Sequence, residues 1–221
     1  MKKLIIVFIV SGLLAFACND SNNTASEKDD TSIQQPADTA SASTDNSSKQ
    51  QDNSMMSSMM KHMDMMKNMS SMNDPDHDFA MMMKHHHTAA TEMAQSEISQ
   101  GQQETVKSIA RKMVSEQEKD IQQLDNFLKN NAAEKKAGGD KFHHEMMQMM
   151  KDMPMDMSKT QENVDQQFTS LMIQHHEQGI HMANMYLPYA KNQEMKALAN
   201  KIIKAQQTEI KELKDVQAKH H

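Results

Sequence analysis

The feature that most constrains the fold of this chain is an internal repeat. A shift of 89 residues aligns residues 76–124 with residues 165–213 without a gap, and 13 of the 49 aligned positions are identical. The identical pairs are Asp76/Asp165, Phe79/Phe168, Met83/Met172, His86/His175, His87/His176, Met93/Met182, Ala94/Ala183, Lys107/Lys196, Ala110/Ala199, Lys112/Lys201, Gln117/Gln206, Ile121/Ile210 and Leu124/Leu213. A gapless register across a presumed turn means that both copies share one architecture.

Each copy is predicted to form a helical hairpin. Asp74-Pro75 supplies an N-cap and a first-turn proline, and Gly101 marks the end of that helix. Leu187-Pro188 breaks the corresponding helix of the second copy. The segments 103–130 and 190–218 carry apolar residues at helical spacing. Two packed hairpins predict an all-α fold, a four-helix bundle.

Composition excludes several other classes of protein. Aromatic residues make up 4% of the chain, too few for a typical β-sandwich or barrel core. A single cysteine allows neither an internal disulfide nor a zinc finger. The net charge of −6 argues against binding nucleic acid through its phosphates.

The N-terminus has the layout of an export signal. Lys2 and Lys3 precede an apolar run that ends at Cys18, and this run is shorter than a membrane-spanning helix requires. The cysteine directly after Ala15-Phe16-Ala17 resembles a bacterial lipobox, so we expect Cys18 to be lipidated and to anchor the protein in a bacterial cell envelope. Plain secretion after cleavage is the alternative.

The chain is therefore expected to contain six parts. They are a signal peptide (1–17), a disordered tether after lipidated Cys18 (18–54), a Met-rich segment (55–73), the first hairpin (74–130), a Met/His-rich connection (131–160) and the second hairpin (161–219). The tether consists mainly of polar residues that cannot bury enough apolar surface to fold.

The apolar face of each first helix also carries imidazole and thioether groups. These candidate metal ligands are Met83, His86, His87 and Met93 in the first copy, and Met172, His175, His176 and Met182 in the second. Gln117, Asp120, Gln206 and Glu209 lie on the facing stripes, where a carboxylate can orient a metal-bound imidazole. The alternative is that the histidines are neutral core residues hydrogen-bonded to these groups.

Methionine is abundant, at 26 of 221 residues, and clusters outside the hairpins as well. The candidate ligands there are Met59, His62 and Met63 before the first hairpin, and His143, His144, Met147 and Met150 in the connection. Adjacent methionines point in different directions on a helix. We therefore do not expect both members of an adjacent pair to lie on one buried stripe. Thioether sulfur suits Cu(I) and Ag(I), and nearby imidazole extends the range to Cu(II). The alternatives are a flexible partner-binding surface or an oxidant sink.

These motifs resemble the family called domain of unknown function 305. The shared pattern is Phe-x3-Met-x2-His-His-x5-Met-Ala, followed by Lys-x2-Ala-x6-Gln-x3-Ile, and it occurs in both copies. The resemblance implies a ferritin-like four-helix bundle, and its CopM-like members are periplasmic copper-binding proteins involved in copper resistance. Leu124 and Leu213 occupy positions where the family often has methionine. The resemblance therefore implies no metal ligand on the second helix of each hairpin.

We therefore expect a copper-binding lipoprotein of the periplasm or cell envelope that sequesters or carries Cu(I), and also Cu(II), and contributes to copper tolerance. Its expected partners are the metal ion, a membrane through the N-terminal lipid, and copper-transport proteins. We expect no enzymatic activity, because the sequence has no Gly-x-Ser-x-Gly, His-Glu-x-x-His, phosphate-loop or Glu-x-x-His pattern. The alternative is a helical envelope protein whose Met-rich surface binds a partner protein or scavenges oxidants.

Overall fold

The computed structural model describes residues 47–152 and 163–219, with side chains from Met55 onward. Over these ranges the chain is all-helical and contains no strand. Its helices are α1 (Ser47–Lys67), α2 (Pro75–Gln100), α3 (Glu104–Asn130), α4 (Gly139–Asp152), α5 (Val164–Tyr186) and α6 (Gln193–Gln217). None of the described helices is long and apolar enough to cross a membrane. The predicted signal peptide, Cys18 and residues 19–46 lie outside the described residues. The predicted disordered tether extended to residue 54, but residues 47–54 form the first part of α1.

The helix ends follow from the capping residues. Asp74 accepts a hydrogen bond from the backbone N–H of Asp76 and caps α2, whose end is followed by Gly101. Asn163 and Asn192 cap α5 and α6 in the same way. These contacts satisfy backbone donors that the first turn of a helix leaves free. Helices α2 and α3 occupy the segment predicted for the first hairpin and contact each other, and α5 and α6 do the same in the second copy.

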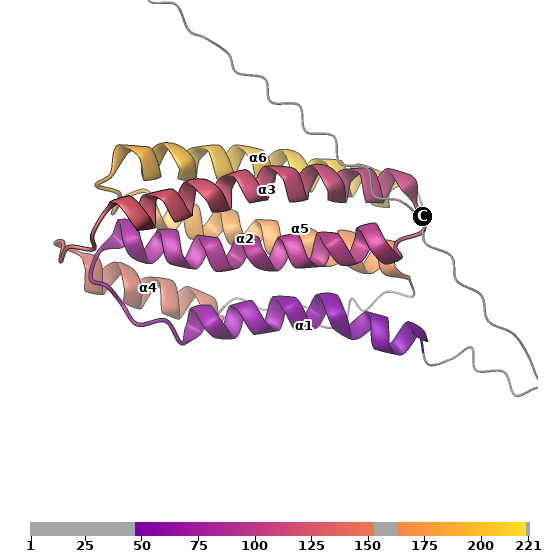
Figure 1. The fold of residues 1–221 in the computed structure, drawn as a ribbon, viewed down its shortest axis with the longest axis horizontal. Coiled ribbons are helices and arrows are strands. Elements are labelled where there is room, and N and C mark those ends of the chain that lie inside the picture. Colours follow the sequence, from indigo (N-terminus) through magenta and orange to yellow (C-terminus); the bar gives the residue numbers. More distant parts are fainter. Residues whose placement is uncertain (1–46, 153–162, 220–221) are drawn as a thin grey trace, which may run out of the picture. The chain divides into compact units, whose positions relative to one another are not determined.

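The two hairpins pack on each other and carry the remaining helices on one side (Figure 1). Helix α2 contacts α3 and α5, while α6 contacts α5 and α3. Helix α1 lies against α2 and α5, and α4 contacts the same two helices. The described part of each Met-rich segment therefore contains a helix, α1 or α4, that covers α2 and α5, the helices that carry the paired histidines.

Helix α1 buries one side of its surface. Met55, Met59, His62 and Met66 recur every three or four residues and are 6% exposed or less, as expected for a helix with a single packed stripe. Their neighbour Met60 is 43% exposed. On α1 the two members of an adjacent pair thus face in different directions, as the sequence indicated.

The same expectation is wrong for α4. Met149 and Met150 are adjacent and both buried, at 9% and 5% exposure. The reason is that α4 contacts both α2 and α5. A helix seated between two others buries a wider arc of its surface than a single stripe. The side chains of Met149 and Met150 therefore both lie in the protein interior.

An aspartate at the start of each hairpin holds the turn of the other hairpin. The carboxylate of Asp76 accepts hydrogen bonds from the backbone N–H groups of Lys191 and Asn192, at 3.0 and 3.1 Å. Asp165 accepts the equivalent bonds from the N–H groups of residues 102–103, at 3.1 and 2.8 Å. Charge-assisted bonds of this kind are about twice as strong as neutral ones. They explain why this aspartate is identical in the two copies.

The repeat differs in the residue that faces each of these aspartates. The Tyr186 hydroxyl donates a hydrogen bond of 2.6 Å to Asp76. The equivalent position in the first copy is Glu97, which is fully buried. Burial and the negative charge of Asp165 raise the pKa of Glu97 to about 8. Gly101 leaves room for this carboxyl group, because a Cβ there would lie 2.0 Å from Glu97 Oε1.

The raised pKa of Glu97 predicts a pH-dependent stability. The native state binds this proton up to about pH 8, whereas an unfolded glutamate loses it near pH 4.5. The stabilisation that comes from the Glu97 proton is therefore complete below pH 4.5 and is lost as the pH rises to about 8. Over this range the free energy of unfolding falls by up to ~1.4 kcal/mol per pH unit. We expect Glu97→Gln to remove that decline. Urea unfolding of both proteins at pH 5, 7 and 9 checks this, and parallel profiles would contradict it.

Candidate metal centre

A small cavity lies where α1, α2, α4 and α5 meet. Its volume is about 20 Å³, enough for roughly one water molecule. The lining residues are Met63, Met66, His86, Met149, Met150, Gln178 and Met182. Five thioethers and one imidazole therefore surround a space of atomic size, with no carboxylate among the lining residues. This donor set suits a soft monovalent ion such as Cu(I) or Ag(I).

His86 supplies the imidazole in the lining of this cavity. Its side chain is 1% exposed, and neither Nδ1 nor Nε2 has a hydrogen-bond partner among the described residues. Burial, followed by the nearby His87 and His176, places the pKa of His86 well below its usual value. The imidazole is therefore neutral and has a free lone pair. A buried polar atom without a partner costs about 1–3 kcal/mol, and a bound ion would satisfy one of these nitrogens.

The His86 ring is held in place by close packing at the centre of the repeat. It stacks on its counterpart His175 with ring centroids 3.6 Å apart. A Cβ at position 179 would lie 2.8 Å from His86 Cε1 and 2.5 Å from Gln206 Oε1. Gly179 therefore permits α5 to approach both groups, where the first copy has Ala90.

The neighbouring histidines face carboxylates on the second helices. His176 Nε2 lies 2.8 Å from a carboxylate oxygen of Glu209, and His87 Nε2 lies 3.7 Å from Asp120. These are the pairs that the facing stripes indicated. The side-chain amides of Gln117 and Gln206 are buried and have no hydrogen-bond partner among the described residues. The core around the histidines is therefore polar and incompletely hydrogen-bonded.

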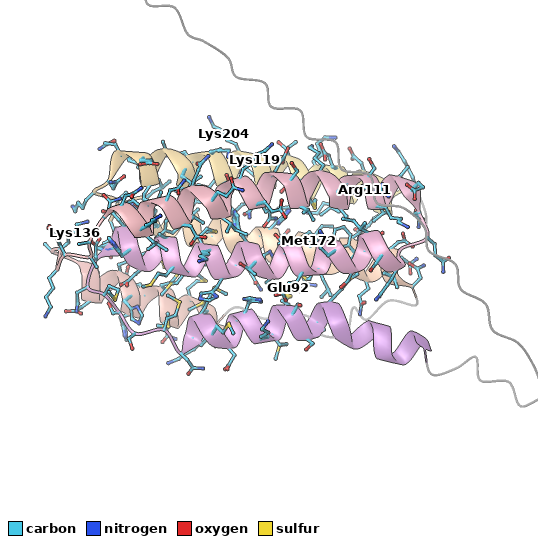
Figure 2. All side chains as sticks on the ribbon, viewed as in Figure 1. Glu92, Arg111, Lys119, Lys136, Met172 and Lys204 are labelled. Atoms are coloured by element: carbon cyan, nitrogen blue, oxygen red, sulfur yellow. The ribbon has the colours of Figure 1, made fainter. Side chains whose placement is uncertain are left out.

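The structure divides the ligands predicted from the sequence into several groups. Met63, His86, Met150 and Met182 line the cavity. Met59, Met83, Met93 and Met172 lie in the hydrophobic clusters of the core. The role of these four methionines as ligands stays a prediction. Figure 2 shows Met172 between the helices, whereas Lys119 and Lys204 lie on the outer side of α3 and α6.

The remaining predicted ligands lie away from the cavity lining. His143 is half-buried with Nδ1 3.8 Å from Asp78, His144 is exposed, and Met147 packs partly against the core. His62 contacts α2 through Glu92. Cys18 lies outside the described residues.

Sequence reasoning did not select three of the lining residues, Met66, Met149 and Gln178. Met66 follows His62 by four residues and continues the buried stripe of α1. Met149 is the neighbour in sequence of the predicted ligand Met150, and Gln178 carries no sequence signal for this role. Among the described residues, no group of three or more His, Asp or Glu side chains is arranged to hold a metal ion. A metal site in this cavity would therefore depend on the methionine sulfurs that line it.

Comparison with protein families gives two matches to one family model. The model named domain of unknown function (DUF305) matches residues 23–128 and residues 129–217. The first match contains α1, α2 and most of α3, and the second contains α4, α5 and α6. Each match thus joins one Met-rich helix to one hairpin. No match was found among curated protein sequences.

Comparison with solved structures gives several forms of the protein CopM. The Cu(I)-bound form is 26% identical, with a TM-score of 0.51, and the match covers 66% of this chain and 97% of CopM. The Cu(II)-bound form is 25% identical with a TM-score of 0.51 and the same coverage. An Ag-bound form from co-crystallization is 25% identical with a TM-score of 0.50, over 65% of this chain and 96% of CopM.

Proposed function

Because this chain belongs to the DUF305 family, whose structural relatives here include copper-bound CopM, we propose that it binds copper in the cell envelope. In this proposal it sequesters or carries Cu(I) through Met and His ligands and contributes to copper tolerance. Cu(II) and Ag(I) are further ions that it binds. The proposal gives the protein no enzymatic role.

The observation that carries the proposal is the Met/His cavity. Five methionine sulfurs from three helices meet the unprotonated imidazole of His86 around about 20 Å³ of space. A purely apolar core would gain more from leucine, which packs with better-defined rotamers. A soft ion explains both the choice of methionine and the histidine nitrogens that lack partners.

The proposal also includes the arrangement and location of the chain. We infer that α2, α3, α5 and α6 form a ferritin-like four-helix bundle, with α1 and α4 as a Met-rich cover. Lipidation of Cys18 would anchor this domain to a bacterial membrane through residues 19–46. The remaining predicted ligands, on α4 and in the core clusters, would hold further ions or pass copper to a transport protein.

The exposed methionines favour one alternative function. Met60, Met65 and Met72 are 42–45% exposed. A flexible thioether surface of this kind suits binding to a partner protein or reaction with oxidants. Under this alternative the protein would release all copper on desalting, and its methionines would form sulfoxides without any effect of metal.

A pH comparison tests the proposal. Thioethers have no proton to lose, and the low pKa of His86 keeps that ring neutral in weak acid. We expect several equivalents of Cu(I) to stay bound through anaerobic desalting at both pH 7.5 and pH 5. Cu(II), whose imidazole ligands must be neutral to bind, should be largely released at pH 5. Equal loss of both ions at pH 5 would exclude methionine as the main ligand.

A further inference from the structure

A second pair of imidazoles meets between α1 and α2, apart from the Met/His cavity. The ring centroids of His62 and His85 are 5.9 Å apart, with an angle of 40° between the ring planes. A metal–nitrogen bond of about 2.0 Å places two imidazole centroids on one ion about 4.5–6.3 Å apart, depending on the angle at the metal. The two rings therefore have the spacing of ligands that share an ion. They are 23 residues apart in sequence, so the fold itself brings them together.

Glu92 fixes the orientation and tautomer of His62. His62 Nε2 lies 3.1 Å from Glu92 Oε1, and Ser58 donates a hydrogen bond to the other oxygen of this carboxylate. Figure 2 shows Glu92 extending from α2 toward α1. Because a carboxylate oxygen accepts this hydrogen bond, Nε2 is the nitrogen of His62 that donates it.

The other nitrogen of His62 is therefore free to bind. Nδ1 is buried in a side chain that is 4% exposed, and it has no hydrogen-bond partner among the described residues. A carboxylate on one ring nitrogen and a free lone pair on the other is the usual arrangement of a metal-bound histidine. His85 is half-buried beside the His62 ring.

We propose that His62 Nδ1 and a ring nitrogen of His85 bind one Cu(II) ion between α1 and α2, with water completing the coordination. Nitrogen donors and a nearby carboxylate favour a borderline divalent ion, and Cu(II) binds such donors most strongly in its series. The choice of copper rests on the proposed function, whereas the two-imidazole site rests on the geometry alone. Because α1 also supplies Met63 and Met66, this ion would fasten α1 over the Met/His cavity.

Electron paramagnetic resonance of the full mature chain with one equivalent of Cu(II) at pH 7.5 tests the site. The wild type should show coupling to two imidazole nitrogens. His85→Gln should lose this signal and weaken Cu(II) binding about 100-fold, and Glu92→Gln should weaken it about 10–100-fold through the orientation of His62. His181→Gln is the matched control, because His181 is exposed on α5 and should leave the spectrum unchanged.

Retention of Cu(I) by the same variants separates the possible failures. If His85→Gln keeps the wild-type Cu(II) spectrum and affinity, the two-imidazole site is wrong, whatever Cu(I) does. If wild type retains neither ion, the proposed function is also wrong. Circular dichroism and unchanged Cu(I) retention by His85→Gln show that the variant is folded, so that a lost Cu(II) signal reports the site.

Discussion

Replacing Met149, Met150 and Met182 together with leucine is expected to lower the affinity of the Met/His cavity for Cu(I) by at least about 100-fold, or ~2.7 kcal/mol. The substitution removes three of the five sulfurs that line the cavity. Leucine preserves the volume of methionine closely enough that each exchange costs less than about 1.5 kcal/mol of stability. Competition with a Cu(I)-specific chelator under anaerobic conditions measures the affinity.

Met113→Leu is the matched control for this experiment. Met113 is 1% exposed on α3 and packs in the hydrophobic cluster that excludes the cavity methionines. We expect this variant to bind Cu(I) as the wild type does. Equal affinity of the wild type, the control and the triple variant would show that the cavity sulfurs do not bind copper.

Asp76→Ala is expected to cause the largest loss of stability of any single substitution discussed here, about 3 kcal/mol. The change leaves the Tyr186 hydroxyl and two turn N–H groups without their acceptor. It also removes an ion pair with Lys136, whose Nζ lies 2.9 Å from the carboxylate. Urea unfolding at pH 7 measures the loss as a shift of the midpoint.

Two further variants bracket this prediction. Asp165→Ala should cost less, because Asp165 accepts turn N–H groups but faces Glu97 in place of a tyrosine hydroxyl. Asp215→Ala, which removes an exposed ion pair with Lys211, should change stability by less than about 0.5 kcal/mol. Equal stability of the Asp76 and Asp215 variants would contradict the role of Asp76 in joining the hairpins.

Much of the helical framework could be predicted from the sequence because its signals are local. Asp74, Pro75 and Gly101 act within a single helical turn, and their capping roles depend on few distant contacts. The apolar stripes of α3 and α6 have a periodicity that only a helix satisfies. The repeat then required the second hairpin to copy the first. Even the pairing of His176 with Glu209 followed, since both lie on facing stripes.

The cavity could not be predicted because it depends on how four helices meet. Met66 comes from α1, Met149 from α4 and Met182 from α5, and no spacing in the sequence relates them. The repeat search also found only the hairpins. The family matches show a longer unit that includes one Met-rich helix with each hairpin. That placement explains why α1 and α4 both cover α2 and α5, and why both Met149 and Met150 are buried.

The pairing of His62 with His85 could not be predicted for the same reason, because it depends on how α1 and α2 meet. Sequence reasoning placed His62 with Met59 and Met63 as one ligand group, because the three are close along α1. In the structure Met59 packs in one hydrophobic cluster, Met63 lines the cavity and His62 faces α2. Residues three or four apart share a face of a helix, but the face of α1 meets different neighbours along its length, so nearness in sequence does not give a shared site.

The central claim is that methionine sulfur holds copper in this protein. X-ray absorption spectroscopy of the mature chain loaded anaerobically with one equivalent of Cu(I) tests it most directly. We predict a first shell dominated by sulfur at about 2.3 Å, the usual length of such bonds, with one nitrogen from His86. A first shell of nitrogen and oxygen alone would contradict the account.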